Sequence, residues 1–174
     1  NPNFPRPEGP LRPAAVLVPI IERPAGLQVL FTRRTETLSQ HGGQISFPGG
    51  RLDPGDVDAE AGALRETEEE IGLDRHYVEI LGRLDPYVTV TSYAVTPVVG
   101  MVQPGFTLTL HAGEVAEAFE VPLEFLMDPK NHQQHGGLRN GVERRWYAMP
   151  YGDYYIWGAT AGMLMNLYNL LQRA

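Results

Sequence analysis

Residues 50–73 read GRLDPGDVDAEAGALRETEEEIGL, a glycine-containing turn that runs into a strongly acidic stretch. If this stretch is helical, Glu66 and Glu70 lie one above the other and Glu69 stands beside them, because an α-helix has about 3.6 residues per turn. Three other residues fall near the opposite side: Leu64, Thr67 and Ile71. The sequence therefore predicts a helix with one carboxylate face and one packing face.

The ends of this helix are also marked in the sequence. Asp58 is a suitable N-cap, and Gly72 follows Ile71 where a glycine commonly ends a helix. Clustered Glu on a helix usually forms a solvated face, but like charges four residues apart destabilise the helix. A divalent cation held by oxygen ligands would compensate that repulsion, and Mg²⁺ binds carboxylates together with substrate phosphates. We therefore expect a metal site here.

These residues resemble the signature of the Nudix hydrolases, which is a Gly, an acid and then Arg-Glu-x-x-Glu-Glu-x-Gly. The matching residues are Gly50, Asp56, Arg65, Glu66, Glu69, Glu70, Gly72 and Leu73. Asp56 stands where the family has Glu, one extra residue separates it from Arg65, and Thr67 replaces the usual aliphatic residue or Ala. The resemblance implies the α/β fold of that family, an α/β/α sandwich with a mixed sheet.

The preceding residues 30–50, LFTRRTETLSQHGGQISFPGG, are similar to the segment that marks the coenzyme A pyrophosphatase subfamily. The positions that fit are Thr32, Arg34, Gly43, Phe47, Pro48, Gly49 and Gly50. Thr35 replaces a Ser or Ala, and Ser39 stands where the subfamily has Arg. The extra residue before Arg65 is usual in this subfamily. Residues 121–132 and 154–167 also look like its members.

The resemblance implies roles for the acidic helix. Glu66 and Glu70 would be the main ligands of Mg²⁺ or Mn²⁺, with Glu69 as a further ligand or as the residue that holds the attacking water. Arg65 would orient the carboxylates, and its pairing with Glu69 is natural at a spacing of four residues. Gly50, or the glycine before it, would lend a backbone carbonyl to the metal.

The general base is left open between the helix and a later segment. Glu69 is one candidate, and Glu114, Glu117 and Glu120 are the others. Glu114 follows a glycine in an expected loop and is the preferred one of the three, whereas Glu120 adjoins an apolar segment. An ordinary exposed acid is as good an interpretation for each of the three, and if Glu69 is the base none of them is needed.

The net charge of −7 argues against nucleic-acid binding, because the chain has no basic stripe and Lys130 is its only lysine. A phosphate-rich substrate would then be held by the metal and by local arginines. The candidates are Arg33, Arg34 and Arg51, and Arg34 is preferred because the subfamily pattern keeps it. Plain surface charge is the alternative for each.

These features predict an enzyme that hydrolyses the diphosphate linkage of a nucleoside diphosphate joined to another group. The resemblance implies coenzyme A or its derivatives as substrate, with 3′,5′-ADP and 4′-phosphopantetheine as products. Another substrate such as ADP-ribose stays open, because Ser39 replaces an arginine. A catalytically silent domain that binds a nucleotide is a third interpretation, and the intact acidic cluster argues against it.

Composition predicts one globular domain. The chain has 174 residues, 43% of them hydrophobic, which suffices for a single core. We expect residues 1–13 to be a Pro-rich arm and residues 14–174 to be one Nudix domain. Absence of cysteine excludes disulfides. The apolar run at residues 14–21 is too short to span a bilayer and the start is polar, so we expect a cytoplasmic protein that does not bind membranes.

The remaining elements follow from hydrophobic patterns. Residues 14–21 and 27–33 flank a Pro-Ala-Gly turn and predict a hairpin. Further strands are expected at residues 78–81, 87–90, 95–102, 106–110, 144–149 and 153–156. Helices are expected at residues 123–127 and 159–173, and residues 129–141 read as a loop in which His132 and His135 are solvated rather than metal ligands. The last helix carries an apolar stripe for core packing or for a homodimer face: Met163, Leu164, Leu167 and Leu171.

Overall fold

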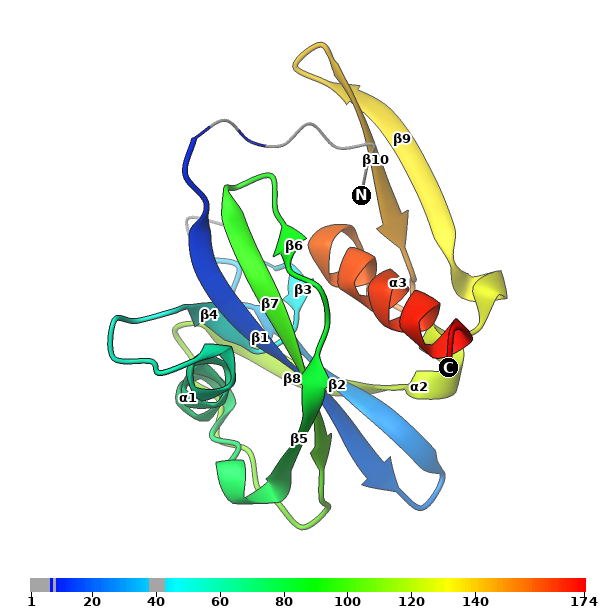
Figure 1. Cartoon of the computed structure of the whole chain (residues 1–174). Coiled ribbons are helices and arrows are strands. Elements are labelled where there is room, and N and C mark those ends of the chain that lie inside the picture. The colour runs from blue at the N-terminus through cyan, green and yellow to red at the C-terminus, as the bar shows by residue number, and fades with distance from the viewer. Residues whose placement is uncertain (1–6, 8, 38–42) are drawn as a thin grey trace.

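The computed structural model describes residue 7, residues 9–37 and residues 43–174. A mixed eight-stranded sheet lies between two helices, and a separate hairpin projects beside the second helix (Figure 1). The sheet strands are β1 (Arg12–Arg23), β2 (Gly26–Arg34), β3 (Ile45–Ser46), β4 (Gly49–Arg51), β5 (Val78–Arg83), β6 (Tyr87–Val88), β7 (Tyr93–Val102) and β8 (Val115–Pro122). The expected α/β/α sandwich with a mixed sheet is confirmed.

Strand β1 is the centre of the sheet. One edge pairs with β7 in parallel over most of its length, while the other edge pairs antiparallel with β4 at residues 14–16 and with β2 at residues 20–23. Pro19 falls between those two partners, where β1 has no neighbouring strand on that side. A proline is tolerated there because no ladder hydrogen bond is lost. The split leaves β4 paired with the first part of β1, where β4 contacts the acidic helix.

Helix α1 (Ala59–Ile71) covers one face of the sheet, and α3 (Gly158–Gln172) covers the other (Figure 1). Alternate residues of β1 therefore enter two cores. Ala15, Leu17 and Ile21 pack on the α1 side, and Val16, Val18 and Ile20 pack on the α3 side. This explains why residues 13–21 of β1 are all apolar, as in strands buried on both faces.

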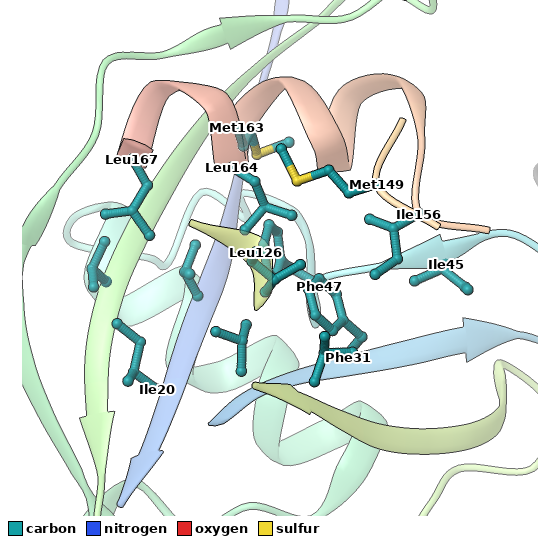
Figure 2. Packing of buried hydrophobic residues seen from close by; sticks show 14 of the residues in the cluster. Ile20, Phe31, Ile45, Phe47, Leu126, Met149, Ile156, Met163, Leu164 and Leu167 are labelled. Atoms are coloured by element: carbon teal, nitrogen blue, oxygen red, sulfur yellow. The ribbon is translucent and has the colours of Figure 1, made fainter. Parts of the chain in front are cut away.

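The core on the α3 side holds three of the four residues of the predicted stripe. Figure 2 shows Met163, Leu164 and Leu167 on the side of the helix that faces the sheet, in the same cluster as Ile20, Phe31 and Phe47. Leu171 lies beyond this contact and is 46% exposed. The stripe is therefore core packing at its first three positions, which is one of the two expected roles.

Several elements differ from the expectation. Residues 106–110 form no strand, and β8 was not expected because its Ala and Glu residues favour helix in isolation. The expected loop at 129–141 contains η2 (Pro129–Asn131) and β9 (Gln133–Arg139), which pairs with β10 (Val142–Ala148). Residues 153–156 form only an isolated bridge.

The hairpin of β9 and β10 has a local cause. Asn140 and Gly141 both have positive φ, 53° and 75°, as the two central residues of a type I′ turn require. This Asn-Gly pair fixes the register although β9 itself has weak strand propensity. The remaining short elements are η1 (Arg75–Tyr77) and α2 (Leu123–Leu126). No helix in the described parts of the chain has the length and apolar character needed to cross a membrane.

Candidate active site

Helix α1 begins and ends where the sequence predicts. The Asp58 carboxylate accepts the N–H of Ala61 at 2.8 Å, which satisfies a donor at the open first turn. Gly72 has φ of 68° and ends the helix in the left-handed conformation. A Cβ at Gly72 would also lie 2.9 Å from the backbone nitrogen of Thr109, so this position requires glycine for two reasons. Local contacts therefore fix both ends of the helix.

Arg65 joins the turn before the helix to the acids on it. Its Nε and Nη2 both donate to Asp56 at 2.9 Å, and its Nη1 donates to Glu66 at 3.1 Å. The expected contact with Glu69 is longer, at 3.4 Å. The bidentate bond holds the pKa of Asp56 down at about 2. Asp56, rather than Glu69, is thus the main partner of Arg65.

Glu70 is the most buried acid of the helix, with 7% of its surface exposed. Burial raises its pKa to about 8, and the nearby Glu66 and Glu114 add to the rise, while the N–H of Gly49 at 3.2 Å opposes it. Burial likewise raises the pKa of Glu66 despite its bond to Arg65. Two neighbouring carboxylates are therefore held in a place that disfavours their negative charge.

Two glycines, Gly49 and Gly50, lie where β4 passes this helix. A Cβ on Gly50 would lie 2.9 Å from the Glu66 carboxyl carbon, and one on Gly49 would lie 2.6 Å from the Cα of Val16 in β1. Such distances are shorter than ordinary contacts. The two glycines thus let the backbone run between β1 and the carboxylates, with one of its N–H groups on Glu70.

The donor set fits a divalent cation. Glu66 and Glu70 are oxygen donors with partly uncompensated charge, and Mg²⁺ or Mn²⁺ prefers such ligands. Within the residues that the structure describes, however, no three acidic or imidazole side chains converge as a complete ligand set. Glu69 has a side chain 60% exposed and lies against Arg65. The ligand set of Glu66, Glu69, Glu70 and Gly50 stays a prediction.

The segment expected as a strand at residues 106–110 instead closes the end of α1. The N–H of Thr109 donates to the carbonyl of Ile71, and the N–H of His111 donates to the carbonyl of Glu70, both at 2.8 Å. These bonds satisfy carbonyls that a helix end leaves without partners. Glu114 follows, with its N–H on the His111 carbonyl at 2.9 Å. The loop thereby brings Glu114 beside the acidic helix.

Of the three later acids, only Glu114 faces that helix. It is close enough to raise the pKa of Glu66 and of Glu70, and no described residue forms an ion pair with it. Glu117 instead binds Arg33 at 3.2 Å, and Glu120 binds Arg23 through two bonds of 2.8 and 2.9 Å. Glu117 and Glu120 are therefore paired with arginines away from the acidic helix.

The three candidate arginines lie in different parts of the structure. Arg34 lies on the α1 side, where it lowers the pKa of Glu70, and its Nε is buried with no hydrogen-bond partner among the described residues. Arg33 contacts Glu117 on the α3 side. Arg51 is exposed at the end of β4, and its carbonyl accepts a bond of 3.3 Å from Arg65. Only Arg34 directs a cation toward the carboxylates.

His132 and His135 lie outside this group. His132 contacts the Leu126 carbonyl at 2.7 Å and His135 contacts Gln133 at 2.8 Å, both away from α1. Ser39, which stands where an arginine was expected, lies outside the described residues. Tyr154, which binds Glu117, was not predicted from the sequence. The Gly-Asp pair before it indicates a turn but not a site.

Known proteins are similar to this chain in sequence and in fold. A profile of the NUDIX domain family matches residues 11–140. A relative from Photorhabdus laumondii, described as an uncharacterized Nudix hydrolase NudL, is 42% identical over 161 residues, which are 92% of this chain and 86% of the relative. That range includes the acidic helix, the glycines of β4 and Glu114.

Two solved structures have the same fold at low sequence identity. The Nudix hydrolase RenU from M. smegmatis is 19% identical with a TM-score of 0.64, covering 93% of this chain and 86% of its own. The NUDIX domain of Shewanella oneidensis NrtR, solved with ADP ribose, is 16% identical with a TM-score of 0.57, covering 94% and 90%. The chain belongs to the Nudix hydrolase family, whose members act on pyrophosphate bonds.

Proposed function

We propose that this enzyme hydrolyses the diphosphate bond of coenzyme A or its derivatives and releases 3′,5′-ADP and 4′-phosphopantetheine. The proposal is supported by residues 30–50, which resemble the coenzyme A pyrophosphatase segment. In the structure this segment supplies Arg34 on the α1 side and leads through Phe47 and Pro48 into the glycines of β4. The subfamily pattern and the acidic helix thus meet at one place.

The observation that carries the diphosphate chemistry is the arrangement of charge around Glu70. Acids outnumber the arginines near it, and the pKa values of Glu66 and Glu70 are raised by burial. Mg²⁺ or Mn²⁺, when bound, would neutralise phosphate oxygens and lower the pKa of a coordinated water. Glu66 and Glu70 would hold it, with Glu69 and the Gly50 carbonyl as further ligands.

Three side chains have the remaining roles: Arg65, Arg34 and Glu114. Arg65 holds Glu66 in place through its bonds to Asp56. Arg34, whose charge acts on Glu70, binds a phosphate oxygen of the substrate through its guanidinium group and anchors the diphosphate beside the carboxylates. Glu114 accepts the proton of the attacking water, because no described ion pair occupies it and it lies near both carboxylates. If Glu69 accepts the proton instead, removing Glu114 will leave the pH profile unchanged.

Product analysis tests the substrate. The protein is incubated with coenzyme A, with ADP-ribose and with dinucleoside polyphosphates, each with Mg²⁺, Mn²⁺ or a chelator, and products are identified by mass spectrometry. Metal-dependent release of 4′-phosphopantetheine from coenzyme A is the expected result. Cleavage of ADP-ribose alone would overturn the substrate and keep the reaction, and Ser39 in place of arginine makes ADP-ribose the second candidate. The inactive variant Glu70→Gln excludes a contaminating enzyme.

A further inference from the structure

A pocket lies on the α3 side of the sheet, away from the carboxylates. Its volume of about 390 Å³ is within the range of roughly 300–1,000 Å³ typical of ligand sites. The residues that line it are Arg33, Glu117, Tyr151, Gly152, Asp153 and Tyr154. Nothing in the metal-dependent reaction described above uses these side chains.

The tyrosines of this pocket are held in place by a tight turn. The backbones of Tyr151 and Tyr154 bind each other twice at 2.9 Å, and Gly152 between them has φ of 56°. The ring of Tyr154 stacks on Phe119 of β8 with centroids 3.6 Å apart and planes at 5°. One face of Tyr154 is therefore covered by protein, and the ring is fixed before a ligand arrives.

The floor of the pocket presents a donor beside an acceptor. Arg33 Nε donates to one oxygen of Glu117 at 3.2 Å, and the Tyr154 hydroxyl donates to the other. These bonds lower the pKa of Glu117, so it is ionised and accepts hydrogen bonds only. Each carboxylate oxygen keeps further acceptor capacity, and the terminal nitrogens of Arg33 have no acceptor among the described residues.

The charge of the pocket excludes a phosphate as its ligand. Arg33 is offset by Glu117, and Asp153 at the rim adds a second negative charge. A neutral, planar ligand with an adjacent donor and acceptor is the complementary partner. Adenine carries such a pair, the N6 amino group and a ring nitrogen, whereas hypoxanthine has an oxygen in place of the amino group. Bases also stack on tyrosine rings.

We propose that the pocket of Arg33, Glu117 and Tyr154 binds the adenine base of the substrate and selects it against hypoxanthine. This inference rests on the proposed function, in which the substrate carries an adenine nucleotide. Glu117 accepts from the N6 amino group, Arg33 donates to the neighbouring ring nitrogen, and the base lies against Tyr154. Arg33 and Arg34 are consecutive and face opposite sides of β2.

Nucleotide binding to the whole protein tests this site without requiring turnover. Affinities for ADP and for IDP are measured by calorimetry in the presence of Mg²⁺. The unaltered protein is expected to prefer ADP by about tenfold, the size of one well-placed bidentate base contact. Glu117→Gln is expected to bring the ratio close to one, because an amide can donate to the oxygen of hypoxanthine. The control Tyr155→Ala changes an exposed neighbour outside the pocket and should keep the preference.

The ratio of two affinities in one variant is insensitive to partial unfolding, since both ligands meet the same folded fraction. Equal binding of ADP and IDP by the unaltered protein would overturn the proposal. So would an unchanged preference in folded Glu117→Gln. If coenzyme A is not cleaved but ADP is preferred, the substrate proposal fails and the base site stands. If coenzyme A is cleaved without a preference for ADP, the base site fails and the substrate proposal stands.

Discussion

Two regions of this molecule combine arginine with glutamate and reach opposite electrostatic states. Around α1 the acids exceed the arginines, and burial raises the pKa values of Glu66 and Glu70. In the pocket on the α3 side, Arg33 and the Tyr154 hydroxyl both bind Glu117 and lower its pKa. An incompletely compensated acidic group therefore favours a cation from outside, whereas a matched pair can recognise the edge of a neutral ligand.

The largest effect is expected from removing the charge of Glu70 in the acidic group around α1. Glu70→Gln keeps the shape of the side chain and should lower kcat by about a thousandfold, because under the proposed function it removes a metal ligand and several kcal/mol of transition-state stabilisation. Steady-state kinetics on the cleaved substrate measure it. Glu68→Gln is the matched control on the same helix, where Glu68 binds only the exposed Arg75. Equal losses in both variants would show that Glu70 has no special role among the acids of this helix.

The stability of the metal-free protein should depend on pH through the same residue. The folded pKa of Glu70 is raised from 4.5 to about 8, so its stabilising contribution is complete below pH 4.5 and is lost as pH rises through 8. The original protein should lose up to about 5 kcal/mol of stability between pH 4.5 and pH 8, since one pKa unit is worth about 1.4 kcal/mol, and Glu70→Gln should remove this dependence. Denaturant unfolding in chelator at pH 5, 7 and 9 measures the difference, and parallel curves would contradict the assigned burial of charge.

A backbone change should disturb the same carboxylates without altering any charge. Gly50→Ala adds a methyl group that would lie 2.9 Å from the Glu66 carboxyl carbon, so Glu66 must move. We expect a loss of about thirtyfold in kcat/KM, since misplacement of such a group by about 1 Å costs up to a hundredfold. Gly55→Ala, with no atom within 4 Å of the added carbon, is the control. Full activity of both variants would show that the Glu66 position is not critical.

The smallest effect is expected from changing Asp56, which contacts Arg65 rather than the carboxylates themselves. Asp56→Asn weakens the hold on Arg65 and should lower kcat/KM by about tenfold, as loss of a group that orients metal ligands does. Asp53→Asn alters an exposed acid near the same guanidinium, at 3.4 Å, and should cost less than about threefold. If the two variants behave alike, Arg65 is held by its surroundings rather than by Asp56.

Local signals in the sequence predicted the acidic helix down to its caps. Asp58 and Gly72 act through contacts within one or two turns, so their roles are visible in the chain itself. The hairpin of β1 and β2 was predicted for the same reason. The Asn-Gly turn at residues 140–141 is equally local and was overlooked.

Other parts depend on partners that are distant in sequence. Strand β8 contains helix-favouring residues and forms because β2 offers an edge. Residues 106–110 bind the carbonyls of α1 instead of a strand, which no periodicity reveals. The roles of Arg33 and Arg34 could not be separated from composition, because only the two faces of the folded sheet distinguish them. A role for Tyr154 is apparent only from its contact with Glu117 in the folded structure.

The split edge of β1 has a consequence for how the chain folds. The N-terminal hairpin has few rungs, and the longer partner of β1 is β7, which follows only after α1 and β5 have been made. Pairing across such a long intervening segment is slow compared with local hairpins and helices. We therefore expect α1 to form early as a helix but to gain its buried acids late, when β7 completes the sheet beneath it. Nascent chains that end before Val102 should lack the fixed carboxylate geometry.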